Sequence, residues 1–365
     1  MPLNLNILRP EELPTPLLPA AGTEAACAEL VRRFRRTPDE TVRVLGRRYI
    51  GTYTAAALRE FEIADEGLGE ALAKVVTWEL GFTARRKLAM HDLHELARQK
   101  QIRPLLIKGA ANSLCFYPQE SQRMSKDIDL VLPATEVERF RPGASVRPDN
   151  VEWPPDHVGT FALHTIPVEI HFRFGDLPDW GLPADLAAEA VPCPGYPGFD
   201  VPSPVVAFTI ALLHSYKHIG EMTWDFIDLR QILKSGQLNW PAVVKLWQET
   251  GLTRHLFPSL LLTARLTGQV PREIVTTLEE KLDSADRQAA RLFGNVVAAR
   301  RFRLLKETRW RCWLEHKSFL RESLLKFAGS RAITAKLTGL APDQPGFWWN
   351  HLFVLPLKRM WHILG

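Results

Sequence analysis

The stretch that decides the fold is Leu105 to Leu132, LLIKGAANSLCFYPQESQRMSKDIDLVL. It begins with a short apolar strand at 105–107, passes through a Lys108-Gly109 turn and a helical segment, and ends in an apolar strand with Asp127 and Asp129. Side chains two residues apart on a strand point the same way, so the two carboxylates face one side. Such close carboxylates repel each other unless a cation lies between them, and Mg²⁺ prefers oxygen ligands of this kind. The stretch therefore predicts a metal site suited to phosphate chemistry.

A third acidic candidate lies on the strand predicted at 168–172, VEIHF. Its alternation puts Glu169 and His171 on one side, and its apolar residues on the other side against a core. If this strand lies beside the strand of Asp127 and Asp129, three carboxylates converge. Three carboxylates can hold two Mg²⁺ ions roughly 3.5–4 Å apart, the arrangement used for in-line phosphoryl displacement.

Length and composition set the broad class of the protein. The 365 residues suffice for two domains, or for one domain with an elaborated helical part. Four scattered cysteines without CxxC spacing argue against a disulfide framework or a zinc site. The N-terminus lacks the pattern of a signal peptide, and the longest apolar run, Val205 to Leu213, is too short to span a bilayer. We therefore predict a cytoplasmic protein with no transmembrane segment.

Positive charge gathers at the C-terminal end. From residue 287 onward there are 15 lysines and arginines against 4 aspartates and glutamates, although the whole chain carries only +5. Such a region suits an anionic partner such as RNA, a membrane surface or an acidic protein, and equally a solvated helical face. The tail after residue 342 carries Trp348, Trp349 and Trp361, which suit either a membrane interface or docking on the rest of the chain.

The order of predicted elements is helix, sheet, helix. Residues 1–22 are rich in proline and are predicted to be extended. The apolar residues from 23 to 97 have helical spacing, with breaks near Thr37-Pro38 and Ile50-Gly51. The last part of this region, 66–97, is predicted to be one long helix. After the acidic strand we predict a short helix at 135–140, a proline-bearing loop at 141–155, and a hairpin of strands at 161–163 and 168–172 around residues 165–167. A Pro- and Gly-rich linker at 182–204 precedes a helix at 205–233 and further helices to about residue 327.

These residues together resemble the signature of an uncharacterised bacterial nucleotidyltransferase family within the DNA polymerase β-like superfamily. The resemblance rests on Lys108-Gly109, Tyr117, Arg123, Asp127-Ile128-Asp129-Leu130 and Val168-Glu169-Ile170-His171, and it extends to His214, Lys217, His218, Trp224 and Asp228. It covers about residues 70–233, and more loosely the helices beyond. It implies an α+β (α/β mixed) fold, in which a small mixed β-sheet core lies between an N-terminal helical region and a C-terminal helical domain. The corresponding segments are 1–65, 66–200, 201–330 and a basic aromatic tail at 331–365.

The resemblance also assigns roles to the acidic residues and to the turn. Asp127, Asp129 and Glu169 would bind Mg²⁺, and Glu169 would also help to deprotonate the acceptor hydroxyl. Lys108 and Gly109 stand where the superfamily has a Gly-Ser turn that holds the triphosphate of the NTP. The next residue is Ala110 and not serine, so Lys108 would substitute as a point charge.

Further nucleotide contacts are predicted with alternatives. Ser113 is a weaker substitute for the missing serine, and Arg123 either contacts the β- or γ-phosphate or is a surface arginine. His214 and His218 have the spacing of a transition-metal pair but lack a third ligand, so they and Lys217 are expected to line the nucleotide cleft. His214 is alternatively a hydrogen-bonded core residue. Asp225 and Asp228 are expected to pair with basic residues of neighbouring helices, and Trp224 to lie in the core.

Three functions compete at this point. The first is a Mg²⁺-dependent nucleotidyltransferase that moves a nucleoside monophosphate from an NTP to a small molecule, a sugar, a protein hydroxyl or an RNA 3′ end. The second is a catalytically silent module with the same fold, which the short interval between Asp129 and Glu169 keeps open. The third is a glycosyltransferase that uses Asp-x-Asp to hold a nucleotide sugar, although that chemistry requires neither the Lys108-Gly109 turn nor Glu169.

Overall fold

The computed structural model is a mixed α+β fold. It describes residues 7–140 (except 138), 151–152, 158–171, 189–217, 223–290 (except 285 and 289) and 344. The chain divides into two compact units, Met1–Leu282 and Asp283–Gly365, and all the elements discussed below belong to the first. In the described residues no helix is both long enough and apolar enough to cross a membrane.

The N-terminal part is helical from residue 10 onward. Its elements are η1 (Pro10–Glu12), η2 (Thr15–Leu17), α1 (Leu18–Ala21), α2 (Glu24–Arg36), α3 (Pro38–Arg47) and α4 (Gly51–Glu60). The predicted breaks near residues 37 and 50 are confirmed. The prediction of an extended segment at 1–22 is wrong for its described part, because each of the three short helices there has a proline in its first turn, where the missing N–H costs no hydrogen bond.

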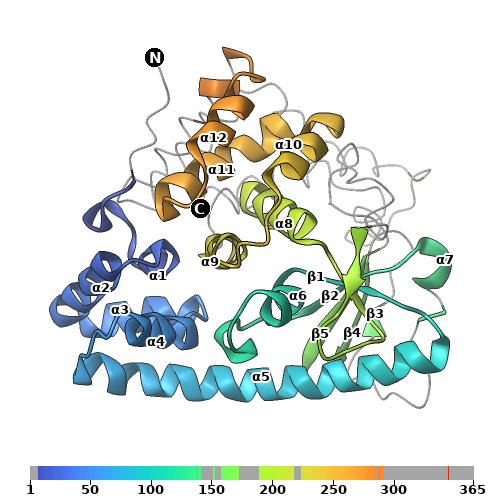
Figure 1. Cartoon of the computed structure of the whole chain (residues 1–365). Helices are drawn as coiled ribbons and strands as arrows, with labels where there is room; N and C mark the ends of the chain where they lie inside the picture. The colour runs from blue at the N-terminus through green and yellow to red at the C-terminus, as the bar shows by residue number, and fades with distance from the viewer. Residues whose placement is uncertain are drawn as a thin grey trace. The chain divides into compact units, whose positions relative to one another are not determined.

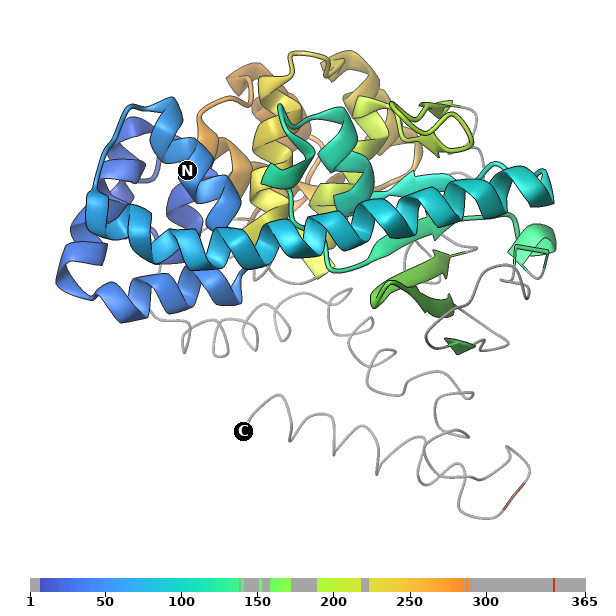
Figure 2. The same ribbon diagram turned by 90° about the horizontal axis from the view of Figure 1, so that it is seen from below.

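The long helix α5 (Glu66–Lys100) confirms the predicted helix at 66–97. It begins at Asp65, whose carboxylate accepts a hydrogen bond from the backbone N–H of Leu68 at 2.9 Å. Its first half packs against α3 and α4, and its second half packs against the sheet. Figures 1 and 2 show this helix as one rod that passes the N-terminal helices at one end and the strands at the other.

The sheet has seven strands in the described residues, in the order β3-β4-β5-β2-β1-β7-β6. They are β1 (Leu105–Ile107), β2 (Ile128–Val131), β3 (Val151–Glu152), β4 (Val158–Leu163), β5 (Ile166–His171), β6 (Val191–Pro192) and β7 (Asp200–Val201). The helix α6 (Lys108–Cys115), the turn η3 (Glu120–Gln122) and the predicted short helix, α7 (Ala134–Val137), lie between the strands along the chain. The pair β2 and β5 is parallel, and β1 is antiparallel to β2.

The core of the sheet lies between its apolar face and α5. Ile166, Val168 and Ile170 on β5 are fully buried, and they cluster with Ala89, Met90 and Leu93 on α5. Glu169 and His171 alternate with them and are only partly buried, as the sequence predicts. The opposite face of the same strands is therefore left for a site.

The hairpin of β4 and β5 is confirmed, but its turn lies one residue earlier than predicted. His164 and Thr165 form a two-residue loop with φ of +52° and +65°, as a type I′ turn requires. Pro167 therefore lies within β5, before the pairing with β2 begins at Val168. A proline fits there because no ladder bond to β2 is lost.

The linker predicted at 182–204 is wrong in part. Residues 182–188 lie outside the described residues, but β6 and β7 form a small antiparallel pair whose β7 lies beside β1. The backbone N–H of Asp200 donates to the carbonyl of Pro104 at 3.0 Å, and Asp200 is ion-paired with Arg103 at 2.6 Å. Two-residue strands are too short to show an alternating pattern in the sequence.

The helical part after the sheet begins with two helices and not with the predicted single helix. Here α8 (Pro204–Lys217) and α9 (Thr223–Lys234) pack against each other, and residues 218–222 lie outside the described residues. Then follow α10 (Trp240–Glu249), α11 (Thr253–Thr267) and α12 (Arg272–Glu279), which confirm the helical pattern up to residue 279. The helices predicted at 291–327 and the aromatic tail lie outside the described residues, apart from Gln344.

Candidate functional site

Lys108 occupies the turn from β1 into α6. Its φ is +53°, a left-handed conformation that is uncommon for a residue with a side chain and often marks functional sites. Its Nζ lies 2.6 Å from Oδ1 of Asp129 on the neighbouring strand. The sheet register explains this contact, because Ile107 pairs with Asp129 and Lys108 follows directly.

The parallel pairing of β2 and β5 brings Glu169 directly beside Asp129. The strand of Glu169 thus lies beside the strand of Asp129, as the predicted convergence of the carboxylates requires, and the prediction is confirmed for these two residues. His171 lies two positions further along the same face of β5, and its Nε2 is 2.9 Å from Asp129 Oδ1 and 3.7 Å from Glu169 Oε2. One ligand atom from each of the three residues lies within 4.8 Å of the others.

The charges of these groups are strongly coupled. Burial opposes ionisation of Asp129, but the hydrogen bond to His171 and the charge of Lys108 outweigh it and lower the pKa of this carboxyl. For Asp127 and Glu169, burial and then the negative charge of Asp129 raise the pKa. The site therefore holds more negative charge than Lys108 alone compensates, which favours binding of a cation.

Asp127 lies just before β2 and is held by Ser125, whose Oγ donates to Asp127 Oδ1 at 3.1 Å. Ser125 in turn packs against Gly109. A Cβ on Gly109 would lie 2.4 Å from Ser125 Oγ, so only glycine allows this close approach. The glycine of the predicted Lys-Gly turn is thus needed to place the segment that carries Asp127. Asp127 is not one of the three residues whose ligand atoms converge.

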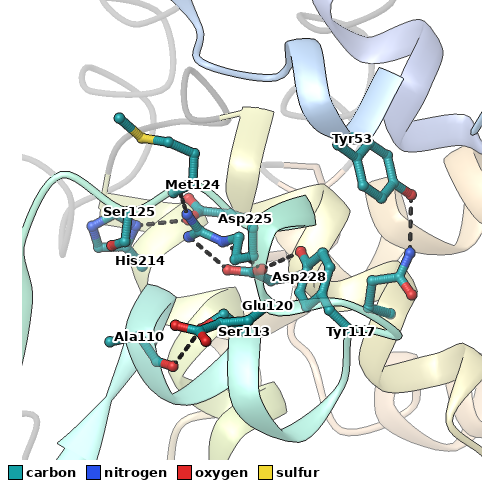
Figure 3. A network of polar contacts seen from close by, with 12 residues as sticks. Tyr53, Ala110, Ser113, Tyr117, Glu120, Met124, Ser125, His214, Asp225 and Asp228 are labelled. Atoms are coloured by element: carbon teal, nitrogen blue, oxygen red, sulfur yellow. Dashed lines mark hydrogen bonds and ion pairs between the residues drawn. The ribbon is translucent and has the colours of Figure 1, made fainter. Parts of the chain in front are cut away.

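Arg123 and Asp228 form a buried ion pair, and Figure 3 shows Asp228 beside Tyr117 and Asp225. The guanidinium of Arg123 donates through Nε and Nη2 to Asp228 on α9, at 2.8 and 2.9 Å, and Tyr117 donates to the same carboxylate at 2.5 Å. The ring of Trp224 lies 4.3 Å from the guanidinium carbon. The expected pairing of Asp228 and burial of Trp224 are confirmed. For Arg123 the alternative of a surface arginine is wrong, and its contact with phosphate stays a prediction.

Ser113 lies in the interior of α6 and is 1% exposed. Its Oγ donates to the carbonyl of Ala110 at 2.7 Å and accepts a hydrogen bond from Arg86 at 3.3 Å. Arg86 is itself buried on α5 and is paired with Glu120 at 3.0 Å. Ser113 therefore links α6 to α5 in this structure, and its predicted contact with a nucleotide has no support from these contacts.

His214 on α8 faces Asp225 on α9, with 2.8 Å between Nδ1 and Oδ1 (Figure 3). Burial lowers the pKa of His214, but the charge of Asp225 and the hydrogen bond to it together outweigh burial and leave the pKa raised. The charges of Lys108 and Asp129 act on the pKa of His214 too. The predicted hydrogen bond of His214 is confirmed, but its side chain is 24% exposed, so it is not a core residue. Lys217 ends α8, and His218 lies outside the described residues.

Two residues near the site were not predicted as functional. His171 appeared in the sequence only as a neighbour of Glu169 on the same face, and the Glu-x-His alternation was the available signal. Asp225 was expected to pair with a lysine or an arginine, but it pairs with His214. That pairing joins α8 and α9, so no local pattern indicates it.

The donor set fits a divalent cation. Asp129 and Glu169 supply carboxylate oxygens from two adjacent strands, Asp127 adds a third carboxylate close by, and His171 supplies a ring nitrogen. All of them are ligand types that divalent metals accept in proteins.

Comparison with known proteins identifies one family. Residues 38–268, well over half of the chain, match the family described as "Uncharacterised nucleotidyltransferase". No curated protein and no solved structure matches the chain. The matched range includes α3 to α11 and all the site residues described above.

Proposed function

Because the chain belongs to this uncharacterised nucleotidyltransferase family, we propose that it transfers a nucleoside monophosphate from an NTP to an acceptor hydroxyl. The observation that carries the proposal is the convergence of Asp129 and Glu169 on adjacent strands, next to the Lys108 turn and Asp127. We propose further that the fold and the chemistry are those of the DNA polymerase β-like superfamily. Mg²⁺ bound by these carboxylates would stabilise charge on the attacking and leaving oxygens.

The residues of the chain have distinct tasks in the proposed reaction. Lys108 supplies positive charge for the triphosphate, and the free N–H groups at the start of α6 add to it. The acceptor oxygen forms a bond to the α-phosphorus, the bond to the bridging oxygen breaks, and pyrophosphate leaves. Glu169 takes the proton of the acceptor hydroxyl, and its raised pKa suits a general base. His214 and Lys217 would line the nucleotide side, together with His218 and Arg123.

The acceptor belongs to the same proposal. A small molecule, a sugar, a protein hydroxyl or an RNA 3′ end all offer the required hydroxyl. The basic region after residue 287 would contact an anionic partner, and binding of RNA there would weaken steeply with salt. We also propose a bacterial source and a cytoplasmic location.

A silent module with the same fold is the second candidate. It is favoured by one contact, since Lys108 Nζ neutralises Asp129 without any metal. A chain that no longer binds metal retains its fold more easily when an internal ammonium compensates the buried carboxylate.

Calorimetric titration of each NTP, with and without Mg²⁺, tests the proposal. We expect metal-dependent binding that is lost in the double variant Asp127→Asn/Asp129→Asn. Asp92→Asn is the matched control, because the Asp92 carboxylate on α5 is 41% exposed and pairs with His164 in the hairpin turn. Absence of binding by the wild type would favour the silent module, and binding of nucleotide sugars alone would favour a glycosyltransferase.

The role of Glu169 needs a rate measurement. Glu169→Gln should lower the rate of transfer more than the affinity for NTP, because a proton acceptor acts in the transition state. A loss of affinity with an unchanged rate would contradict its role as base.

A further inference from the structure

His171 lies in the centre of the ligand cluster. Its Nε2 is the atom that approaches both carboxylates, at 2.9 Å from Asp129 Oδ1 and 3.7 Å from Glu169 Oε2. Its side chain is 16% exposed, so the ring is partly withdrawn from solvent but still open to the site. The family resemblance assigns the metal to the carboxylates and gives His171 no task.

The spacing of these atoms suits a shared ion. Ligand atoms about 2.1 Å from a metal and at right angles to each other lie roughly 3.0 Å apart, and tetrahedral ligands lie somewhat further apart. The two distances from His171 Nε2 bracket this spacing. All three residues are held on paired strands, β2 and β5, so little reorganisation is needed.

The chemistry of the donors distinguishes between metals. Mg²⁺ is a hard ion that prefers oxygen ligands and water. First-row transition ions accept imidazole nitrogen more readily, Zn²⁺, Fe²⁺ and Ni²⁺ most of all and Mn²⁺ alongside carboxylate oxygens. We propose that His171 Nε2 is a direct metal ligand and that the site of Asp129, Glu169 and His171 binds a first-row transition ion such as Mn²⁺ in preference to Mg²⁺. This inference rests on the proposed function, since it names the metal that serves the same site.

The charges of the cluster agree with a divalent ion. Asp127, Asp129 and Glu169 carry three negative charges when ionised, and Lys108 contributes one positive charge, so a divalent ion brings the group to neutrality. Lys108 Nζ and His171 Nε2 now share the same oxygen of Asp129. A metal that uses the His171 nitrogen replaces this hydrogen bond, and Lys108 becomes free to turn toward a phosphate.

Binding of Mn²⁺ alone, without nucleotide, is the test. Free Mn²⁺ is counted by electron paramagnetic resonance, Mg²⁺ is added as competitor, and electron spin echo modulation detects a nitrogen bound to Mn²⁺. We expect a nitrogen signal in the wild type and displacement only by a large excess of Mg²⁺. The variant His171→Asn should lose the nitrogen signal and weaken Mn²⁺ binding by at least about tenfold, while Mg²⁺ binding changes little.

The matched control is His164→Asn. His164 lies in the turn of the same hairpin, is 38% exposed, and hydrogen-bonds Asp92 at 2.9 Å. It should change neither the affinity nor the nitrogen signal. Equal Mn²⁺ binding in His171→Asn and the wild type would overturn the proposal and leave His171 a positioning residue.

The outcomes separate this inference from the proposed function. A wild type that binds Mn²⁺ without a nitrogen signal but transfers nucleotide refutes the inference alone. A wild type that binds Mn²⁺ through nitrogen but binds no NTP refutes the proposed transfer alone. If His171→Asn fails to fold, the nitrogen signal of the wild type still decides.

Discussion

The buried pair of Arg123 and Asp228 offers a direct test of the energetics behind the site. Asp228→Asn preserves the shape of the side chain but removes its negative charge. Asparagine can still accept from Tyr117 and from Arg123 Nε, but its NH₂ group would face Arg123 Nη2, which now donates to Asp228 Oδ2 at 2.9 Å. The guanidinium would then remain buried without the charge of the carboxylate that it contacts.

The expected loss follows from the burial of the pair. Arg123 is 8% exposed and Asp228 is 5% exposed, so water cannot solvate the guanidinium after the carboxylate is removed. Removing one partner of such a pair costs about 3–5 kcal/mol, much of it from the charge that stays behind. This is a large share of the stability of an ordinary domain, about 5–15 kcal/mol.

An exposed pair supplies the comparison. Lys234 Nζ and Glu60 Oε1 are only 2.6 Å apart, but both side chains are more than 40% exposed. The same chemical change there, Glu60→Gln, should cost less than about 1 kcal/mol. Urea unfolding of the wild type and the two variants measures both losses. If Asp228→Asn costs no more than Glu60→Gln, burial does not decide the strength of these pairs and the reasoning is wrong.

Two further predictions concern the turn and a buried carboxylate. Gly109→Ala would place a Cβ 2.4 Å from Ser125 Oγ and should lower the free energy of unfolding by about 1–3 kcal/mol. Gly81→Ala on α5, where a Cβ meets nothing within 4 Å, should raise the free energy of unfolding by about 0.5–1 kcal/mol. Thermal unfolding of both variants measures these changes. Burial raises the pKa of Glu79 above its usual value of 4.5, although the hydrogen bonds that Glu79 accepts act in the opposite direction. The contribution of Glu79 to stability is therefore complete below pH 4.5 and is lost as the pH rises through the raised pKa. The stability advantage of the wild type over Glu79→Gln in urea should therefore shrink as the pH rises, and a constant difference would contradict the assignment.

The elements that the sequence predicts well are those with a long or strict period. The apolar stripe of α5 repeats over many turns, and the alternation of β5 separates Val168 and Ile170 from Glu169 and His171. Both patterns follow from local geometry, so they need no knowledge of the neighbouring elements. The positions of Lys108, Asp129 and Glu169 near one another then depend on two pairings, that of β1 with β2 and that of β2 with β5.

The contacts between distant segments could not be predicted. The engagement of Arg123 by Asp228 joins residues more than a hundred positions apart, and nothing near Arg123 in the sequence indicates its partner. Likewise, Ser113 has the spacing of a phosphate ligand, but the buried Arg86 binds it from α5. The sequence shows which residue types are available, and tertiary packing decides which of them remain open to a substrate.

The register of β5 has a consequence for the kinds of sequence change that the protein can tolerate. A slip of one residue against β2 would turn Glu169 and His171 into the apolar core and Val168 and Ile170 into the site. A single-residue insertion or deletion within β5 should therefore remove Glu169 or His171 from the site, whereas an insertion or deletion of two residues preserves the alternation. Among natural variants of this chain, length differences are expected to gather outside the strand, and those within it to come in pairs.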